Sequence, residues 1–578
     1  MKKTLKKRGQ KFIRRFSRAS QKASEGGKEH LKENFLERIS HIRDIKLLIF
    51  EWVLLVSALI MLGLAQAFWF GDSYAKDTFV PGGTYVEATV GRVNSMNPLF
   101  ATTGSEKVLS RLMFATLVAV DYSGHPGVGL ADSVMASENG KVWTISLRDG
   151  LTWSDGEVID NEDVLFTIGL IQNPAANTIF DANLENVKVI ETETGAIQFT
   201  LPAEYADFQS ALEFPIVPEH ILRDVPVKTL IEADFSNNPV TSGAFGFNAT
   251  QASTTSDERV IYLSANSNYY MGRPMLDSFA IHAYGSKEDV IQAINAGTVT
   301  ATADLTEAES SQIISKAFEE KETPINSGAF LFFNLSNTDL AKADLRRAIR
   351  QGIDLSIIRA AAPGTEALNF PLLNSQIALE KYPELPGYDF EAGKAKIAEI
   401  MGDKTLQLSI ATVNSGYLPA VAEALAEQLR ALGIEAMVTA YAETQEFVAN
   451  VIARRNYDIL VYEVELGAEP DPLAYYHSSQ ARETGLNLSN YRNTMVDDLL
   501  VGARETLDAS LRAKKYETFL EYWVADAPAI GLYQANLTYF YNRNVRTYGD
   551  NLKLVTGLDR FVDVDEWAAV KGTRNRTP

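Results

Sequence analysis

Few side chains in this sequence could carry the chemistry of an enzyme or a metal site. The 578 residues contain six His and no Cys. The absence of Cys excludes disulfides, thiolate zinc sites, Cys nucleophiles and a lipidated Cys anchor. The His residues lie far apart in the chain, which favours structural or surface roles; they are His30, His41, His125, His220, His282 and His477. Only His477, which follows Tyr475-Tyr476, is a candidate for a ligand contact.

Catalytic sequence motifs are also missing. The chain has no HExxH, no GxxxxGK[ST] loop, no GxSxG nucleophile elbow and no EF-hand loop. Carboxylates are too numerous for any one pair to indicate a glycosidase. We therefore predict no catalytic residue, no metal site and no cofactor, and we expect a binding protein. An exported hydrolase is the enzymatic alternative.

The N-terminal region has the pattern of a membrane anchor. Residues 1–46 hold fifteen Lys or Arg and five acids, a net charge of +10. Residues 52–70 contain no charge, and as a helix they span about 28 Å, close to the hydrocarbon thickness of a bilayer. Cations are concentrated before this stretch, and only Lys76 follows it within twenty residues. The positive-inside rule thus predicts a basic cytoplasmic tail (1–46), a transmembrane anchor (47–70) and an extracytoplasmic body.

Other interpretations of this region stay open. The apolar stretch could be a buried core helix, or a cleaved signal peptide, since Ala65-Gln66-Ala67 has a small-x-small pattern. The basic tail could bind anionic lipid or nucleic acid, although a role in topology alone is simpler. Residues 47–578 carry a net charge of −30, which repels nucleic acid and mildly favours cationic or zwitterionic ligands.

The body shows mixed strand and helix patterns after a polar linker (71–82). Residues 142–148 alternate apolar and polar side chains; with the turn Asp149-Gly150 and the following 151–156 they predict a hairpin. Residues 328–335 predict a buried strand. Residues 406–413, a helix that ends at Gly433 and residues 434–440 predict a βαβ unit with a parallel strand pair. The pattern indicates a large α/β ectodomain.

Several sequence blocks, in order, resemble one family. They are LADSVMASENGKVWTISLRDGLTWSDGEVIDNEDV at 130–164, PVTSGAFGF at 239–247, NSNYYMGRPMLDSFAI at 266–281, FFNLSNTDLAKADLRRAIRQGIDLSII at 332–358 and YDILVYEVELGAEPDP at 457–472. Over about residues 83–560 the chain resembles family-5 solute-binding proteins, the extracytoplasmic receptors of peptide and nickel ABC importers. Most of the matched residues, such as Trp153 and Asp155, are better explained by the fold than by ligand contact.

This resemblance implies a two-lobed α/β ectodomain of the type II periplasmic-binding-protein class, in its large peptide-binding form, with a hinge that the chain crosses twice. We place the crossings near residues 283–285 and 530–534. Lobe one then comprises 83–284 plus 532–578, and lobe two comprises 285–531. A ligand would bind in the cleft, and both lobes would close over it.

For a peptide ligand, the resemblance implies strand-like backbone pairing on two edges of the cleft. The residues on these edges are Arg92, Val93, Asn94, Ser95, Glu463, Glu465, Leu466 and Gly467. Peptide receptors of the family usually add a carboxylate for the α-ammonium of the ligand, but the aligned position here is Ala468. Either the flanking Glu465 or Glu469 takes this role, or the ligand has no free amino terminus. Ser242 and Tyr533 are further cleft candidates.

The leading interpretation is a monomeric, membrane-tethered receptor that delivers peptides or similar small solutes to the permease and ATPase subunits of an ABC importer. A surface ligand sensor or scaffold of the same fold, not coupled to transport, is the alternative. No nucleic-acid partner is expected.

Overall fold

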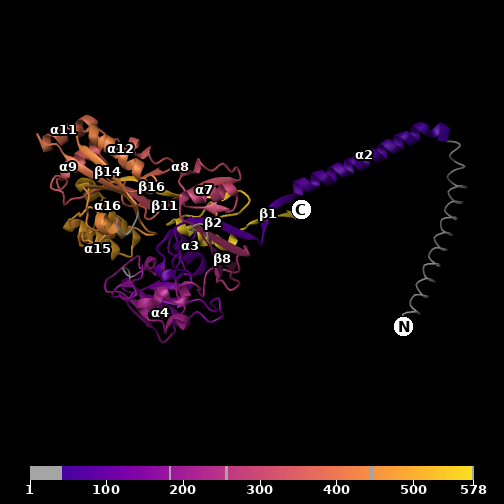
Figure 1. Ribbon diagram of the computed structural model, residues 1–578, viewed down its shortest axis with the longest axis horizontal. Helices are drawn as coiled ribbons and strands as arrows, with labels where there is room; N and C mark the ends of the chain where they lie inside the picture. The colour runs from indigo at the N-terminus through magenta and orange to yellow at the C-terminus, as the bar shows by residue number, and fades with distance from the viewer. Residues whose placement is uncertain (1–41, 181–183, 254–257, 443–446, 576–578) are drawn as a thin grey trace. The chain divides into compact units, whose positions relative to one another are not determined.

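The computed structural model describes residues 42–180, 184–253, 258–442 and 447–575, and its chain divides into two compact units (Figure 1). One unit is formed by Phe79–Lys571. The other contains helix α2 (Ile42–Tyr74). Strands β1 (Ala75–Val80) and β17 (Val570–Asn575) pair in a two-stranded sheet. The segment predicted as a linker therefore contains the end of α2 and a strand.

Helix α2 is long and strongly apolar. Its window Ile49–Gln66 has a mean hydropathy of 2.0, and none of this window is buried within the protein. By length and composition the window can cross a membrane, and it lies inside the segment predicted as an anchor, 47–70. The lack of burial argues against the alternative of a buried core helix.

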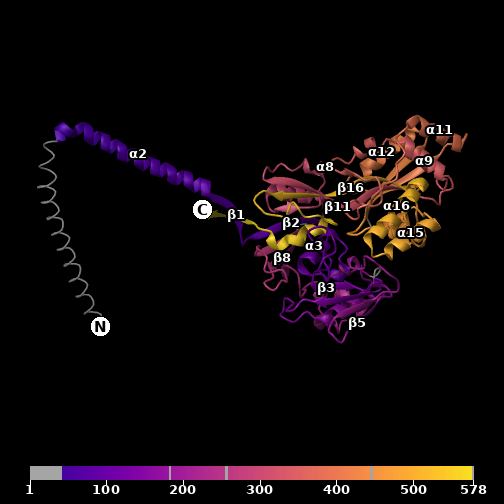
Figure 2. The same cartoon turned by 180° about the vertical axis from the view of Figure 1, so that it is seen from behind.

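The larger unit is built around one mixed sheet of eleven strands among the described residues, in the order β14-β13-β15-β11-β16-β10-β2-β9-β8-β7, with β12 beside β16 (Figures 1 and 2). The strands are β2 (Thr84–Val90), β7 (Phe245–Ala252), β8 (Arg259–Ala265), β9 (Ser278–Tyr284), β10 (Ala301–Thr302), β11 (Phe318–Phe333), β12 (Glu366–Ala367), β13 (Gln407–Val413), β14 (Glu435–Tyr441), β15 (Ile459–Glu465) and β16 (Ala529–Asn542). Strands β11 and β16 are the longest of them and lie side by side in the middle.

A second, antiparallel sheet follows the order β3-β4-β6-β5, with β3 (Ala131–Ala136), β4 (Val142–Leu147), β5 (Lys188–Glu191) and β6 (Ile197–Thr200). The helices of the larger unit are α3 (Gly104–Met113), α4 (Asn161–Ile171), α6 (Glu219–Leu222), α7 (Lys287–Ala296), α8 (Glu307–Ser310), α9 (Ala343–Gly352), α10 (Leu355–Arg359), α11 (Phe390–Met401), α12 (Leu418–Ala431), α14 (Leu473–Tyr476), α15 (Thr494–Arg504) and α16 (Ala509–Asp526). Short 3-10 segments include η9 (Gly557–Glu566).

The predicted βαβ unit is confirmed. Strands β13 and β14 pair in parallel, and α12 connects them. The helix buries Val421, Leu425 and Leu429 completely against the strands, and each such side chain contributes roughly 1.5–3 kcal/mol to stability. Gly433 follows the helix with φ of +88°, a left-handed conformation that glycine adopts without strain.

The hairpin predicted for residues 142–156 is wrong, because residues 142–148 do not pair with residues 151–156. Strand β4 pairs with β3 and β6, not with residues 151–156. Those residues form their own tight loop, closed by a bridge between Thr152 and Val158. The alternation correctly indicated a strand with one buried face, but the choice of neighbour depends on β6, more than fifty residues further along the chain.

Two large hydrophobic cores lie along the central sheet. One contains Tyr85, Trp153 and Trp567, and the other contains Phe332 and Trp523. The two cores are formed largely by separate stretches of chain, so each half of the unit has its own packing.

Strands β11 and β16 both run from one core to the other. Ile325 packs against the first core, whereas Ala329 belongs to the second. On β16, Tyr533 belongs to the second core and Leu537 to the first. The pairing of β11 with β16 shifts register in this stretch, between Pro324 and Gly328 and again after Ala329. Residues 287–296, in contrast, form α7, which contacts β2 and β9.

Candidate functional site

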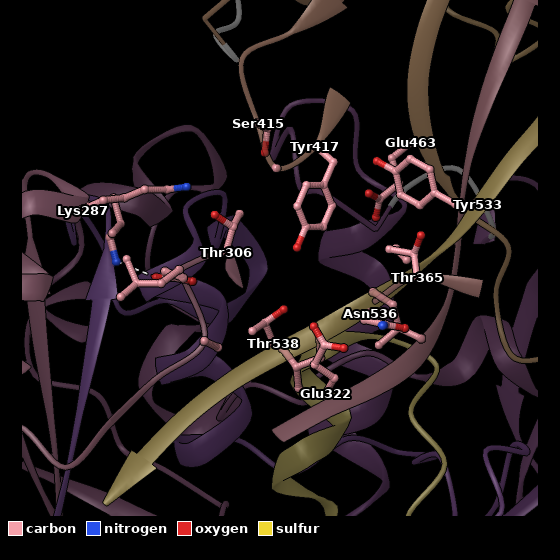
Figure 3. Close-up of a pocket in the computed structure, with 18 residues that line it drawn as sticks. Lys287, Thr306, Glu322, Thr365, Ser415, Tyr417, Glu463, Tyr533, Asn536 and Thr538 are labelled. Atoms are coloured by element: carbon pink, nitrogen blue, oxygen red, sulfur yellow. Dashed lines mark hydrogen bonds between the residues drawn. The ribbon is translucent and has the colours of Figure 1, made fainter. Parts of the chain in front are cut away.

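Two open cavities lie where β11 and β16 pass between the cores. The first has a volume of about 470 Å³ (Figure 3). Its lining includes Val90, Lys287, Ala303, Asp304, Leu305, Thr306, Glu322, Ile325, Thr365, Ser415, Gly416, Tyr417, Glu463, Tyr533, Ala535, Asn536, Leu537 and Thr538. The second has a volume of about 520 Å³ and shares Ala303, Asp304 and Leu537 with the first. The two cavities therefore adjoin along β16.

Pairing within the sheet sets the walls of the first cavity. Glu322 on β11 lies directly opposite Thr538 on β16, and both line the cavity. Glu463 and Glu465 are two residues apart on β15, so their side chains project from the same face of the strand. Glu463 lines the first cavity and Glu465 the second. Their spacing along the strand thus places one carboxylate in each cavity.

Tyr533 is a buried polar side chain at the wall of the first cavity. It is 3% exposed, and its phenol makes no hydrogen bond to any residue that the structure describes. Burial and the negative charge of Glu463 raise the pKa of Tyr533 far above its ordinary value, so its hydroxyl stays protonated. In Figure 3 the ring of Tyr533 lies beside Glu463. The prediction that Tyr533 lies in the cleft is consistent with this position.

The charges of the second cavity are largely paired with one another. Arg111 contacts Glu213 at 3.2 Å and Asp559 at 3.5 Å. Burial raises the pKa of Glu213 to about 7, and the nearby Arg111 opposes this shift. Arg560 also lines this cavity, although it is only 3% exposed.

A buried polar network lies behind the cavities. The guanidinium of Arg560 donates to Glu87 at 2.5 Å, and the Tyr539 hydroxyl donates to the other oxygen of Glu87 at 2.8 Å. Tyr85 and Tyr539 share a further hydrogen bond of 2.8 Å between their hydroxyls. Glu87 is completely buried. This network of hydrogen bonds connects β2, β16 and η9 beside the second cavity.

The edge predicted from Arg92, Val93, Asn94 and Ser95 lies outside the linings of both cavities. Its backbone groups have partners within the protein: Glu106 accepts from the N–H of Asn94 and of Ser95, at 2.8 and 3.3 Å. The carbonyl of Arg92 accepts from Thr103, and that of Val93 from Arg259. The structure lends no support to ligand pairing along this edge, because Glu106 and its neighbours already use these groups.

Ser242 is also engaged within the protein. It is 3% exposed, and its hydroxyl accepts from the N–H of Ala115 at 3.0 Å. The adjoining Gly243 is packed so closely on the end of α3 that an added Cβ would lie 2.5 Å from the Leu112 carbonyl oxygen. The loop around Ser242 therefore seals the first core, and Ser242 lines neither of the two cleft cavities.

The segment after Glu465 is held by protein contacts. The N–H of Leu466 donates to the Asn326 carbonyl at 2.7 Å, and the Leu466 carbonyl accepts from Gln376 at 2.7 Å. The Gly467 carbonyl accepts from Asn326 at 2.9 Å. Ala468, at 8% exposure, belongs to a small apolar cluster with Val120 and Val555.

Glu469 has two partners and lies away from both cleft cavities. Its carboxylate contacts Arg512 and His125, each at 3.3 Å. It lines a narrow space with Asp207 and Asp471, among other residues. A role for Glu469 in binding a ligand ammonium therefore stays a prediction that the structure does not favour, because the guanidinium of Arg512 already pairs with its carboxylate.

His477 has a local structural role. Its Nδ1 accepts from the N–H of Ser479 at 3.0 Å and caps a 3-10 turn, and Asp497 lies 4.0 Å from Nε2. It lines neither cleft cavity. Among the residues that the structure describes, no group of three or more His, Cys, Asp or Glu is arranged to hold a metal ion.

Sequence reasoning missed several residues of the first cavity, notably Glu322, Thr365, Tyr417 and Asn536. None of them lies in a recognisable motif, and they come from four separate segments. One signal in the sequence was available. If the strand predicted at residues 328–335 were extended toward its N-terminal side, Glu322 would lie on the same strand.

Comparison with known proteins identifies the family. Residues 125–485 match the model of the bacterial extracellular solute-binding proteins, family 5. The chain belongs to this family. Its relative AppA, an oligopeptide-binding protein of Bacillus subtilis, is 24% identical over 479 residues, covering 79% of this chain and 87% of AppA.

Solved structures of family-5-like receptors share the fold. AppA of B. subtilis in complex with a nonapeptide has a TM-score of 0.70 at 22% identity, covering 85% of this chain and 99% of that one. CtaP of Listeria monocytogenes has a TM-score of 0.74 at 22% identity, covering 85% and 100%. NikZ of Campylobacter jejuni with Ni(L-His) has a TM-score of 0.70 at 22% identity, covering 84% and 99%. This family-5 chain thus has the two-lobed, type II α/β fold expected for it.

Proposed function

We propose that this family-5 protein is a membrane-tethered receptor that captures peptides, or similar small solutes, in the cleft along β15 and β16 and delivers them to an ABC importer. The observation that carries the proposal is the pair of adjoining cavities, about 470 and 520 Å³, at the strands that link the two cores. These volumes suit small-molecule and peptide ligands. The ligands bound in the AppA and NikZ structures, a nonapeptide and Ni(L-His), support binding of peptides or of small amino-acid complexes.

The lobe boundaries that we propose differ from those expected from the sequence. Residues 285–305 pack with β2 and β9 in the first half of the unit, so the first crossing is better placed in β11 at residues 326–328 than at 283–285. The second crossing, at residues 534–536 of β16, lies next to the expected 530–534. Lobe one would comprise 79–325 plus 537–571, and lobe two 329–533.

The two crossing strands can act as the hinge. The irregular pairing of β11 with β16 at the crossing leaves fewer ladder hydrogen bonds to break during bending. A ligand stabilises closure only through contacts that the open form lacks. Glu463, Glu465 and Tyr533 are placed to make such contacts. They line the cavities from the proposed lobe two, whereas Val90, Asp304 and Leu537 line them from the proposed lobe one.

Helix α2 would retain this receptor at the membrane with the larger unit outside the cell. The apolar window and the excess of cations before it support this arrangement. The permease and ATPase subunits of the importer would be its partners, and a single copy would suffice to enclose the ligand. The receptor would bind its ligand without altering it.

Native mass spectrometry of the full chain, purified in mild detergent from cells grown in a peptide-rich medium, tests the function. We expect extra masses that match short peptides, released when the protein is denatured. Uptake of those peptides should fall in cells that lack the protein. A preparation with no retained solute, which binds no member of a mixed peptide library, would refute the proposal.

A further inference from the structure

The two proposed lobes also meet at a place away from both cleft cavities. Lobe one contributes a short segment that precedes the 3-10 segment η4 (Ser210–Leu212), and lobe two contributes the loop between β15 and α14, the end of α15 and the first half of α16. The residues of this interlobe contact include Tyr205, Ala206, Asp207, Glu469, Asp471, Arg504 and Arg512. The space that they enclose is about 10 Å³, room for no more than a water molecule. It is therefore a packed contact and not a ligand site.

Polar interactions cross directly from one lobe to the other. The N–H of Ala206 donates to the Arg504 carbonyl at 2.8 Å. The Arg504 guanidinium lies over the ring of Tyr205, 4.7 Å from its centroid. The imidazole of His125, in lobe one, contacts the Glu469 carboxylate at 3.3 Å. All of these interactions are made by the protein alone, so they favour closure without help from a ligand.

Apolar residues extend the same contact. Val120 and Val555 of lobe one pack with Ala468 of lobe two in a small buried cluster. The turn between β3 and β4 also approaches lobe two closely, since a Cβ added to Gly140 would lie 3.4 Å from the side chain of Leu507. Opening of the lobes would expose these surfaces to water.

The interlobe contact holds more acids than cations. On lobe two, Arg512 contacts Glu469 at 3.3 Å and Arg504 pairs with Asp471, so each of these carboxylates has a guanidinium. Asp207, which lobe one brings to the contact, is a third carboxylate beside them. These five side chains carry a net charge of −1 when Asp207 is ionised and are neutral when it is protonated.

The surroundings of Asp207 favour its protonated form. Burial and the negative charges of Glu469 and Asp471 raise the pKa of Asp207 to about 7, although the hydrogen bond from Ser210 and the charge of Arg512 oppose the shift. The other ionisable neighbours are Arg504 and the phenols of Tyr205 and Tyr516. Burial raises the pKa of both phenols far above the ordinary value, so they stay neutral.

Opening of the lobes would change the protonation of Asp207. It would separate this carboxyl from Glu469 and Asp471 and return it to water, where its pKa is about 4. Between about pH 4 and 7 the closed form then holds the proton more tightly than the open form, so the ratio of closed to open protein falls as pH rises through this range. His125 acts in the same direction, because it attracts Glu469 only when it is protonated.

We propose that the interlobe contact is a latch that holds the two lobes closed independently of ligand, and that ionisation of Asp207 releases it. The receptor would then retain its ligand at mildly acidic pH and release it more readily at alkaline pH. This inference rests on the proposed division into two lobes and makes no assumption about which solute binds.

The distance between the lobes, measured by double electron–electron resonance, tests this proposal. Because the chain has no Cys, spin labels can be attached at Glu193→Cys in lobe one and Ala392→Cys in lobe two, both exposed positions. The full chain in detergent is first dialysed exhaustively to remove retained solute. We expect the ratio of closed to open protein to fall about 10- to 100-fold between pH 5 and pH 8.

Variants assign this change to the latch. His125→Gln removes the second titrating side chain and should retain a fall of at least about fivefold. Adding Asp207→Asn to His125→Gln should abolish the fall and keep the lobes closed at pH 8. Tyr205→Leu removes the ring beneath Arg504 and should lower the closed fraction at pH 5. Asp132→Asn, which changes an exposed acid on β3 of lobe one, is the matched control and should behave as the native chain.

Two results would overturn the latch. One is a closed fraction of the native chain that does not fall between pH 5 and pH 8, and the other is a full fall in the variant that combines Asp207→Asn with His125→Gln. If the distance responds to a mixed peptide library but not to pH, the latch is refuted while the receptor stands. If it responds to neither, the proposed closing motion of the two lobes is refuted as well.

Discussion

Replacing Glu87 by Gln should destabilise the protein strongly, because it leaves Arg560 buried without its counter-charge. Glu87 is completely buried, Arg560 is 3% exposed, and the two are 2.5 Å apart. Removing one partner of a buried ion pair costs about 3–5 kcal/mol. The Gln amide oxygen can still accept a hydrogen bond from Tyr539, and this bond retains about 1 kcal/mol of the stability. We therefore expect Glu87→Gln to lower the free energy of unfolding by about 2–4 kcal/mol.

Thermal unfolding of the full chain, followed by tryptophan fluorescence, measures this effect. Trp567 is a suitable reporter because its ring centroid lies 5.0 Å from that of Tyr85, at the edge of the network. For a cooperative unit of a few hundred residues, the expected loss corresponds to a fall in Tm of about 2–6 °C.

Two further variants distinguish a buried charge from a general packing defect. Adding Arg560→Met to Glu87→Gln should recover part of the lost stability, since the unpaired cation is then removed. Glu566→Gln is the matched control on η9: Glu566 pairs with Arg546, both are about half exposed, and the change should cost under about 0.5 kcal/mol. The reasoning fails if Glu87→Gln unfolds within 1 °C of the native chain, or if the double variant is no more stable than the single one.

Two other predictions concern pH and topology. Burial raises the pKa of Asp207 to about 7, so the native state holds this proton more tightly than the unfolded state and loses stability as pH rises from about 4 to 7. Asp207→Asn should therefore unfold at a higher temperature than the native chain, by a margin that widens between pH 4.5 and pH 8; a constant margin would contradict this. Because the chain has no Cys, Ser20→Cys and Ser267→Cys can report topology in intact cells. A membrane-impermeant maleimide should label the exposed Ser267→Cys alone, whereas labelling of Ser20→Cys, or a mature chain that begins near Phe68, would contradict a retained anchor with a cytoplasmic N-terminus.

Local sequence patterns correctly predicted those structural elements that are formed by residues close together in the chain. The apolar window of α2 depends on composition alone, and the unit of β13, α12 and β14 closes within 35 residues. Blocks spread over most of the body were enough to predict the family and its fold, because residues that specify turns and strand starts keep their spacing. Glu463 and Tyr533, which the family resemblance suggested for the cleft, both line the first cavity.

Tertiary structure alone decided how those elements meet. The neighbour of β4 is set by β6, and the crossing between lobes that we propose depends on the pairing of β11 with β16, about two hundred residues apart in the chain. Ser242 and Asn94 were expected in the cleft, but Ala115 and Glu106 engage them. Conversely, Glu322 reaches the cavity only because β11 pairs with β16. Hydrogen bonds and charges act over a few ångströms in space, so a sequence can indicate which residues are able to bind, while folding decides which of them remain available to a ligand.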